Sequence, residues 1–383
     1  MRKQRYIAAL LSGLAACMLC GCDHSDPADR ERWTQQAKHN AIEHMRQKYG
    51  FPAYVTDAKP DRSQGIFGGA SIDRVFVTME HEGRTFTVYI SGEDETAEGY
   101  DSYQAAEIEQ ALCDALNTEI PGVSRVKPDA CAAPVLSDNN NADALYAMYY
   151  DGSNLQELLS AETSGFTAYC LQSDLSDSAA FDFVQGYYDD GQRFSAGFYT
   201  VRSAQDLLSV SDTALQLPLY CEASRTLSRA KGGACKTQYQ RNYQCEDAET
   251  GIVWTLSTDD PALSDADFSP PHAALTTTDQ PDPAQFIGHG IGQNVYAASD
   301  TYHFSCDRNT AFTFYMPPFL LADFTQQRKV MDRYYVGIVR TDADGVPTCE
   351  VLSTHFLYDT LYFTVPASDS CEFSFLLLTT SKP

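Results

Sequence analysis

Few groups of residues in this sequence have the types and spacing that chemistry requires. The glycines of GHGIG (288–292) stand at the wrong offsets for a dinucleotide-binding loop, so we expect a flexible turn that feeds a strand. DADG (342–345) lacks the third acid and the closing glutamate of a calcium loop, and its strand-like flanks favour a hairpin turn. No G-x-S-x-G or H-E-x-x-H motif occurs, and the eight histidines are scattered. The sequence therefore indicates no catalytic residue, metal site or cofactor.

The N-terminus joins a positive cluster to a short apolar run. Arg2, Lys3 and Arg5 precede the apolar residues 7–19, which are too few for a membrane span of about 20 residues. This layout predicts a secretory signal. Small residues lead directly into cysteine, an arrangement that resembles the bacterial lipoprotein signal, in which a thiol receives a diacylglyceryl group and cleavage follows just before it.

Two cysteines fit that signal. Residues 14–17, LAAC, match the usual box best, but cleavage there would leave an apolar Met-Leu pair on the mature tether. Cleavage before Cys22 leaves the polar leader CDHSDPADRER, so we assign the signal peptide to 1–21 and lipid attachment to Cys22, with Cys17 as the alternative. An ordinary signal peptide with incidental cysteines is the remaining alternative. Two acyl chains give stable anchoring, which predicts an extracytoplasmic location on the outer face of the cytoplasmic membrane.

The remaining cysteines bear on disulfides rather than metals. Nine follow Cys22, at positions 113, 131, 170, 221, 235, 245, 306, 349 and 371. None forms a C-x-x-C pair, which argues against structural zinc. Export permits disulfides, and the odd number leaves at least one thiol without a partner in the chain. We predict a bridge between Cys349 and Cys371, whose loop of 23 residues gives about 3 kcal/mol of stabilisation; the alternative is that Cys306, Cys349 and Cys371 are reduced core residues.

The chain is strongly acidic. It carries 27 basic and 52 acidic residues, for a net charge of -25. Residues 1–21 contribute three positive charges and no acid, so the mature form has a net charge of -28. Such a charge repels phosphate backbones, which excludes nucleic acid as an expected partner. The chain is 43% hydrophobic, which is enough to fill cores in two or three domains.

The elements that would position any site begin with a helix at 26–50. Asp26 can cap it, Pro27 suits its first turn, and Gly50 suits its end. An apolar stripe at helical spacing runs along it: Trp33, Ala37, Ala41, Ile42, Met45 and Tyr49. His39 and His44 lie about 140° apart around the helix, which is poor for shared metal ligation, and both are expected at the surface.

A β-hairpin and a second helix follow. The run at 73–91 alternates on both sides of EHEG, with Gly83 ending the turn. The second helix, at about 103–117, has Asp101 as its predicted cap and Gln104 three residues on, as in a capping box. We expect its apolar residues to face the hairpin: Ile108, Leu112 and Leu116.

Three quoted runs carry a family resemblance. SQGIFGG, VFVTMEHEGRTFTVYISG and GYDSYQAAEIEQAL together resemble a family of small uncharacterised lipoproteins from Gram-positive anaerobes, over roughly residues 38–117. The resemblance implies an exported, anchored protein with an N-terminal α+β domain. It implies no activity, because none is assigned to that family, and it transfers no functional residue.

The rest of the chain predicts two further domains. Strand-like runs at 144–150, 165–172, 193–201 and 214–223 alternate with helical pieces near 153–160, 178–185 and 203–209. The proline-rich stretch 257–285 predicts a linker or an extended strap. We therefore predict an α+β fold: a helix–hairpin–helix domain at 22–132, a mixed α/β or α+β domain at 142–256, the linker, and an antiparallel β-sandwich or jelly roll at 286–383.

The leading functional hypothesis is a lipid-anchored surface protein that binds a carbohydrate, peptide or protein ligand. It rests on the lack of a nucleophile or metal motif and on the modest size of the domains. Tyrosine-rich runs such as YAMYY (146–150) and DRYY could bind such ligands, although core packing explains them more simply. The alternatives are an extracellular hydrolase acting on wall or dietary polymers and a transporter-associated solute-binding protein.

Overall fold

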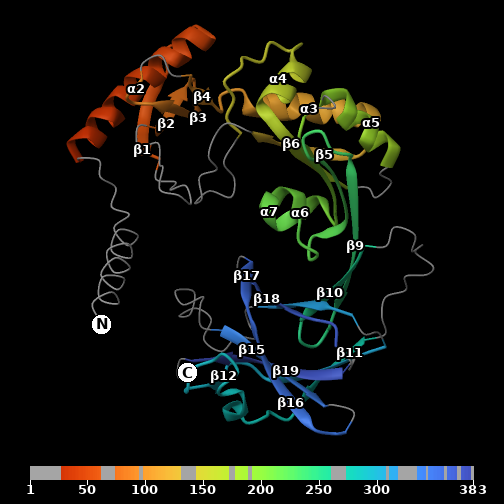
Figure 1. Cartoon of the computed structure of the whole chain (residues 1–383). Coiled ribbons are helices and arrows are strands. Elements are labelled where there is room, and N and C mark those ends of the chain that lie inside the picture. Colours follow the sequence, from red (N-terminus) through yellow and green to blue (C-terminus); the bar gives the residue numbers. More distant parts are fainter. Residues whose placement is uncertain are drawn as a thin grey trace, which may run out of the picture. The chain divides into compact units, whose positions relative to one another are not determined.

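The computed structural model describes residues 27–61, 74–94, 98–130, 144–171, 177–188, 192–259, 273–307, 310–317, 334–341, 344–357, 360–368 and 372–380. Both candidates for lipid attachment, Cys17 and Cys22, lie outside these ranges. The chain divides into two compact units, Met1–Ala168 with Leu175–Ala196 and Arg229–Ala234, and Tyr169–Asp174 with Gly197–Ser228 and Cys235–Pro383. The fold is α+β with a β-rich C-terminal region, which confirms the predicted fold class (Figure 1).

In the first unit, helix α2 (Pro27–Tyr49) packs on one face of an antiparallel sheet. The sheet has the order β1 (Tyr54–Pro60), β2 (Arg74–His81), β3 (Arg84–Ser91), β4 (Tyr100–Asp101). The predicted stripe makes the contact, since Ala37, Ala41 and Met45 are fully buried against alternate residues of β2 and β3. Helix period on one side and strand period on the other thus build one core, as predicted.

The hairpin and the end of α2 depend on positive φ angles. Glu82 and Gly83 alone join β2 to β3, with φ of 48° and 79°, as a type I′ turn requires. Gly50, at φ 80°, ends α2 and donates its N–H to the Arg46 carbonyl at 3.0 Å. These local signals were readable in the sequence, and both elements end where predicted.

The second part of the first unit contains further helices and strands. These are α3 (Ala105–Glu119), β5 (Val123–Ala130), α4 (Leu155–Glu162), β6 (Thr163–Cys170) and α5 (Asp177–Tyr187). Helix α3 packs along β5 and against α4 and α5. The prediction that Ile108, Leu112 and Leu116 face the hairpin is wrong, because α2 already fills the core of that sheet.

The second unit is dominated by strands. Its elements are β7 (Phe194–Val201), α6 (Ala204–Ser209), α7 (Asp212–Leu215), β8 (Cys221–Arg229), β9 (Lys236–Glu246), β10 (Val253–Thr258), β11 (Ala273–Thr278), η1 (Pro283–Phe286), β12 (Tyr296–Ala297), β13 (Thr301–Cys306), β14 (Phe312–Met316), β15 (Tyr334–Thr341), β16 (Pro347–Ser353), β17 (His355–Leu357), β18 (Thr360–Val365) and β19 (Glu372–Thr379). Among these elements the strand orders are β17-β18-β14-β10-β9-β8-β7 and β11-β13-β19-β15-β16, and β12 pairs with β19.

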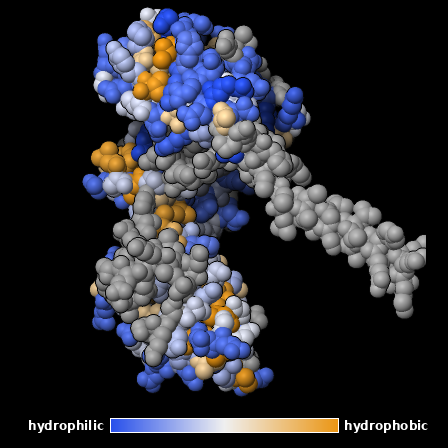
Figure 2. Space-filling model, turned by 90° about the vertical axis from the view of Figure 1, so that its left-hand side faces the viewer, coloured by the Kyte–Doolittle hydropathy of each residue, from blue (hydrophilic) through white to orange (hydrophobic). Residues whose placement is uncertain are grey.

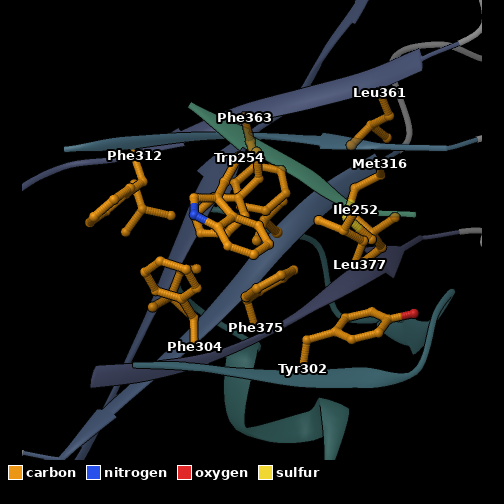
Figure 3. Close-up of a cluster of buried hydrophobic side chains, with 14 of the residues drawn as sticks. Ile252, Trp254, Tyr302, Phe304, Phe312, Met316, Leu361, Phe363, Phe375 and Leu377 are labelled. Carbon is orange, nitrogen blue, oxygen red and sulfur yellow. The ribbon is translucent and has the colours of Figure 1, made fainter. Parts of the chain in front are cut away.

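One core lies between these two sheets. Phe373, Phe375 and Leu377 alternate along β19 into it, and Phe314 of β14 stacks on Phe363 of β18 from the opposite sheet. Figure 3 labels Phe363, Phe375 and Leu377 within this core. This arrangement is the predicted antiparallel sandwich. Successive apolar residues at the end of β19 reflect burial on both faces, because Leu376 and Leu378 pack into a second cluster outside the sandwich.

Part of the sandwich comes from before the proline-rich segment. Trp254 of β10 contacts Phe304 of β13 edge-on, with ring centroids 5.7 Å apart, so the core joins residues from both sides of 257–285. Within that segment, Ala273–Thr278 forms β11 and pairs with β13. The sequence does not predict a strand there, because its threonines and alanines give no clear apolar alternation.

Several local predictions have definite outcomes. The run 144–150 is irregular rather than a strand, and 214–223 holds α7 and the start of β8, because Pro218 cannot continue a ladder. DADG connects the antiparallel strands β15 and β16, as a hairpin turn should, although its first residues lie outside the described ranges. Cys349 lies on β16, whereas Cys371 lies outside the described residues, so their bridge stays a prediction.

The face of the molecule shown in Figure 2 is mostly hydrophilic. On the face shown in Figure 2, hydrophobic side chains of the described residues form small separate patches among hydrophilic ones. Among the described helices, none is both long and apolar enough to cross a membrane.

Gly92 is required where α2 meets the end of β3. A Cβ atom at this position would stand 2.1 Å from the backbone carbonyl oxygen of Trp33. Because a backbone atom cannot rotate away, Gly92→Ala should lower the free energy of unfolding of the first unit by about 1–3 kcal/mol. Urea unfolding followed through Trp33 fluorescence, in a Trp254→Phe background, measures this.

The control is Gly186→Ala on α5, where a Cβ atom would have no neighbour within 4 Å. This change should raise stability by about 0.5–1 kcal/mol, because alanine favours the helix. A Gly92→Ala protein as stable as the parent would show that the helix and strand do not approach this closely.

Candidate functional site

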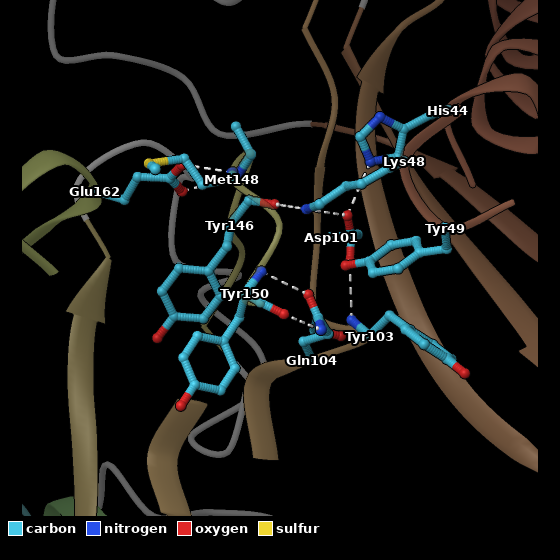
Figure 4. A network of polar contacts seen from close by, with 12 residues as sticks. His44, Lys48, Tyr49, Asp101, Tyr103, Gln104, Tyr146, Met148, Tyr150 and Glu162 are labelled. Carbon is cyan, nitrogen blue, oxygen red and sulfur yellow. Dashed lines mark hydrogen bonds and ion pairs between the residues drawn. The ribbon is translucent and has the colours of Figure 1, made fainter. Parts of the chain in front are cut away.

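A buried carboxylate connects α2 to β4. The Asp101 side chain is 0% exposed, and its Oδ2 lies 2.8 Å from His44 Nε2 and 2.7 Å from Lys48 Nζ. Its Oδ1 accepts hydrogen bonds from the Tyr49 hydroxyl at 2.7 Å and from the Tyr103 backbone N–H at 3.0 Å. His44 and Lys48 stand one helical turn apart, so α2 presents both to the same point (Figure 4).

The partners keep this carboxylate ionised. Burial raises the pKa of Asp101, but the hydrogen bond from His44 and the charge and hydrogen bond of Lys48 outweigh it, so the pKa lies below its usual range. An ionised carboxylate only accepts hydrogen bonds, so His44 Nε2 carries the proton of this contact. Burial and the neighbouring Asp101 charge together raise the pKa of the Tyr49 hydroxyl, which stays a donor.

Two residues of this cluster, Lys48 and Asp101, also bind segment 144–150. Lys48 Nζ donates a second hydrogen bond, of 2.8 Å, to the Tyr146 carbonyl. The backbones of Asp101 and Tyr146 exchange two hydrogen bonds, of 3.0 and 2.9 Å, in an isolated bridge. One residue of the segment is therefore paired as in a strand.

Two further side chains bind the rest of this segment. The buried Glu162 carboxylate accepts the backbone N–H groups of Ala147 at 2.7 Å and Met148 at 2.5 Å. The Gln104 carboxamide donates to the Tyr150 carbonyl at 2.8 Å and accepts its N–H at 2.9 Å. Side chains thus satisfy the backbone groups that a β-ladder would satisfy in a regular strand.

Two sequence-based predictions are corrected here. Asp101 and Gln104 form no capping box, because Gln104 itself is the N-cap residue of α3, without a side-chain cap, and both side chains bind distant groups. His44 is not a surface residue, since its side chain is 13% exposed and bound to Asp101, whereas His39 is exposed as predicted.

A groove runs beside this cluster along the polar face of α2. Its volume is about 510 Å³. The lining residues come from α2, β3, the approach to β4 and the bound segment: His39, Asn40, Glu43, His44, Gln47, Lys48, Ile90, Glu98, Gly99 and Ala147. Gly99 has no room for a side chain, because a Cβ atom there would stand 2.9 Å from His44 Nδ1.

The lining residues of the groove differ in whether their side chains are already hydrogen-bonded within the protein. His44 and Lys48 are fixed by Asp101, whereas the side chains of His39, Gln47 and Glu98 form no hydrogen bond with another described residue. The groove therefore offers available donors and acceptors above a floor that Asp101 holds in place. Across the described ranges, no three His, Cys, Asp or Glu side chains stand close enough together to hold a metal ion.

The tyrosine-rich runs have mixed roles. Tyr146 is buried, whereas Tyr149 is 50% exposed and contacts the Tyr49 ring edge-on at 5.6 Å. Tyr334, in the described part of DRYY, is buried in the sandwich core. Core packing accounts for Tyr146 and Tyr334, and Tyr149 is the exposed ring.

Comparison of the chain with protein-family models, with curated proteins and with solved structures gives no match.

Asp101 should dominate the stability of the first unit. Asp101→Asn leaves Lys48 and His44 buried without their anion, so at pH 7 the free energy of unfolding should fall by about 3–5 kcal/mol. The matched control Asp57→Asn removes an exposed pair with Lys59 and should cost no more than about 1 kcal/mol. Urea unfolding of both variants gives the comparison, and equal losses would contradict a dominant role for Asp101.

The pH dependence has a defined sign. The folded-state pKa of Asp101 is lowered, so its stabilisation is complete above its unfolded pKa of about 3.9 and is lost as pH falls through the folded value. The cost of Asp101→Asn should therefore shrink below about pH 4. Glu162 acts oppositely, because burial raises its pKa despite two backbone hydrogen bonds, so its protonation at falling pH favours the folded state.

Proposed function

We propose that this chain is an extracytoplasmic lipoprotein, anchored through Cys22 to the outer face of the cytoplasmic membrane, that binds a small polar ligand in the α2 groove. The N-terminal positive cluster, short apolar run and cysteine support the anchor. The net charge of -28 of the mature form suits exposure to water and argues against a polyanionic ligand.

The groove is the observation that carries ligand binding. Its volume of about 510 Å³ falls within the range of small-molecule sites. Asp101 holds the floor of the groove in place, and the walls carry polar groups that are available to a ligand. Such a site can bind a ligand with little rearrangement of the protein. His39, Gln47 and Glu98 together supply both donors and acceptors, which suits a ligand that has both.

One contact favours a hydrolase as the second candidate. His44 donates through Nε2 to a buried carboxylate, which is how a histidine general base is oriented. Nδ1 is then the nitrogen that would take a proton from water, since no Ser, Thr or Cys lines the groove among the residues that the structure describes. Wall or dietary polymers are the proposed substrates. A transporter-associated solute-binding role is the third candidate, and it would use the same groove.

The anchor is tested by fractionation. Cys22→Ser should release the protein from the membrane fraction, because no thiol then receives the diacylglyceryl group, whereas Cys17→Ser should leave it attached. The measurement is an immunoblot of membrane and soluble fractions together with metabolic labelling by a fatty acid. Retention and labelling of the Cys22→Ser protein would move the assignment to Cys17.

Ligand binding in the groove is tested on histidine side chains. Neutral sugars, amino acids and dipeptides are added to the mature protein, and imidazole NMR signals are assigned with His39→Gln and His44→Gln. At least one of these classes of compound should shift the imidazole signals of both His39 and His44, but not that of the exposed His355. Gln47→Ala should weaken that ligand at least fivefold.

Two outcomes would redirect the proposal. If no compound shifts the groove signals, the groove is not a site for small polar ligands. If wall or dietary polymers are cleaved and His44→Gln abolishes the cleavage, the hydrolase takes precedence.

A further inference from the structure

A long loop of the second unit covers the outer face of the sheet that contains β19. Phe286 and Ile291 are buried there against Leu376 and Leu378. The Phe286 ring reaches the sheet because β15 has Gly337 beneath it, where a Cβ atom would stand 2.7 Å from the ring. Two apolar contacts and one glycine therefore fix the loop on its sheet.

The loop is also held by its own backbone. Asp282 Oδ1 accepts the Ala284 N–H at 2.9 Å at the start of η1. Ile287 and Ile291 form an isolated β-bridge. Between them, in the GHGIG motif, Gly288 and Gly290 both have φ of 91°. This motif, which has no dinucleotide-binding geometry, shapes a turn that leads into β12.

The outer side of the loop encloses a depression of about 580 Å³. Its lining includes three carboxamides, one carboxylate, one phenol and an exposed aliphatic chain: Gln280, Gln293, Asn294, Asp282, Tyr296 and Ile287. Among the described residues, the three carboxamides have no side-chain hydrogen-bond partner. Each carboxamide carries one acceptor oxygen and two N–H donors.

These groups define the ligand by chemistry. Among the described residues, no Lys, Arg or His lines the depression, so an anion would lack a counter-charge there, and one carboxylate is a poor site for a cation. Carboxamides that both donate and accept match hydroxyl groups, which do the same. Ile287, 44% exposed, and the half-buried Tyr296 add an apolar surface for C–H groups.

We propose that this loop depression binds a neutral glycan. A peptide is the less favoured occupant, because strand addition needs a free edge of useful length and β12 has only two residues. The sugar hydroxyls pair with the carboxamides, and the C–H face of a sugar ring packs on Tyr296 and Ile287. This site is independent of the α2 groove, which belongs to the other unit.

The test is affinity electrophoresis of the mature chain in gels that contain a neutral polysaccharide: mixed-linkage β-glucan, starch, galactomannan or arabinoxylan. At least one polymer should retard the protein, and calorimetry with its oligosaccharides gives the affinity. Gln293→Ala and Asn294→Ala should each weaken binding at least fivefold, and the double variant at least twentyfold. Tyr296→Phe, which keeps the ring, should weaken it less.

The control is Gln205→Ala, which removes an exposed carboxamide on α6 outside the depression and should leave the affinity unchanged. Melting temperatures show that the variants are folded. The proposal is overturned if no polymer retards the protein, if the double variant binds as tightly as the parent, or if only a peptide library binds. Glycan binding that is lost in Gln47→Ala but kept in the double variant would assign the glycan to the α2 groove instead.

Discussion

The structure of the first unit depends on one buried charge, the Asp101 carboxylate, which needs hydrogen-bonding and charged partners. An ionised carboxylate without water is very unfavourable unless hydrogen bonds and opposite charge surround it. Asp101 obtains both from α2, through His44, Lys48 and Tyr49, and so ties the helix to β4. The apolar stripe of α2 supplies most of the burial, but apolar contacts tolerate sliding and rotation. The carboxylate selects a single position among them.

A second buried carboxylate extends this constraint to an irregular segment. Glu162 at the end of α4 holds the backbone of Ala147 and Met148, and Lys48 holds the preceding residue. The segment then contributes Ala147 to the wall of the α2 groove. Groups that stabilise the fold and groups that shape the candidate site are therefore partly the same, so changes at Lys48 affect both.

The sequence predicts the elements better than it predicts their partners. The α2 stripe, the Gly83 turn and the alternation in β19 are local patterns, and each gives the element expected. Asp101 and Gln104 have the spacing of a capping box, yet their partners lie up to 57 residues away along the chain, where no local pattern points. The α2 groove could not be predicted for the same reason, since its walls come from four separate segments.

The way in which residues 144–150 are held has a consequence for the order of folding. The bond from Lys48 to the Tyr146 carbonyl spans 98 residues, and the bonds from Gln104 to Tyr150 span 46. Contacts of such sequence separation form only after the entropy of closing long loops has been lost. The segment has no β-ladder of its own, so we expect it to dock after α2, β4 and α4 have met. On this expectation its amide protons become protected from solvent exchange last, and the α2 groove is completed only when the unit is.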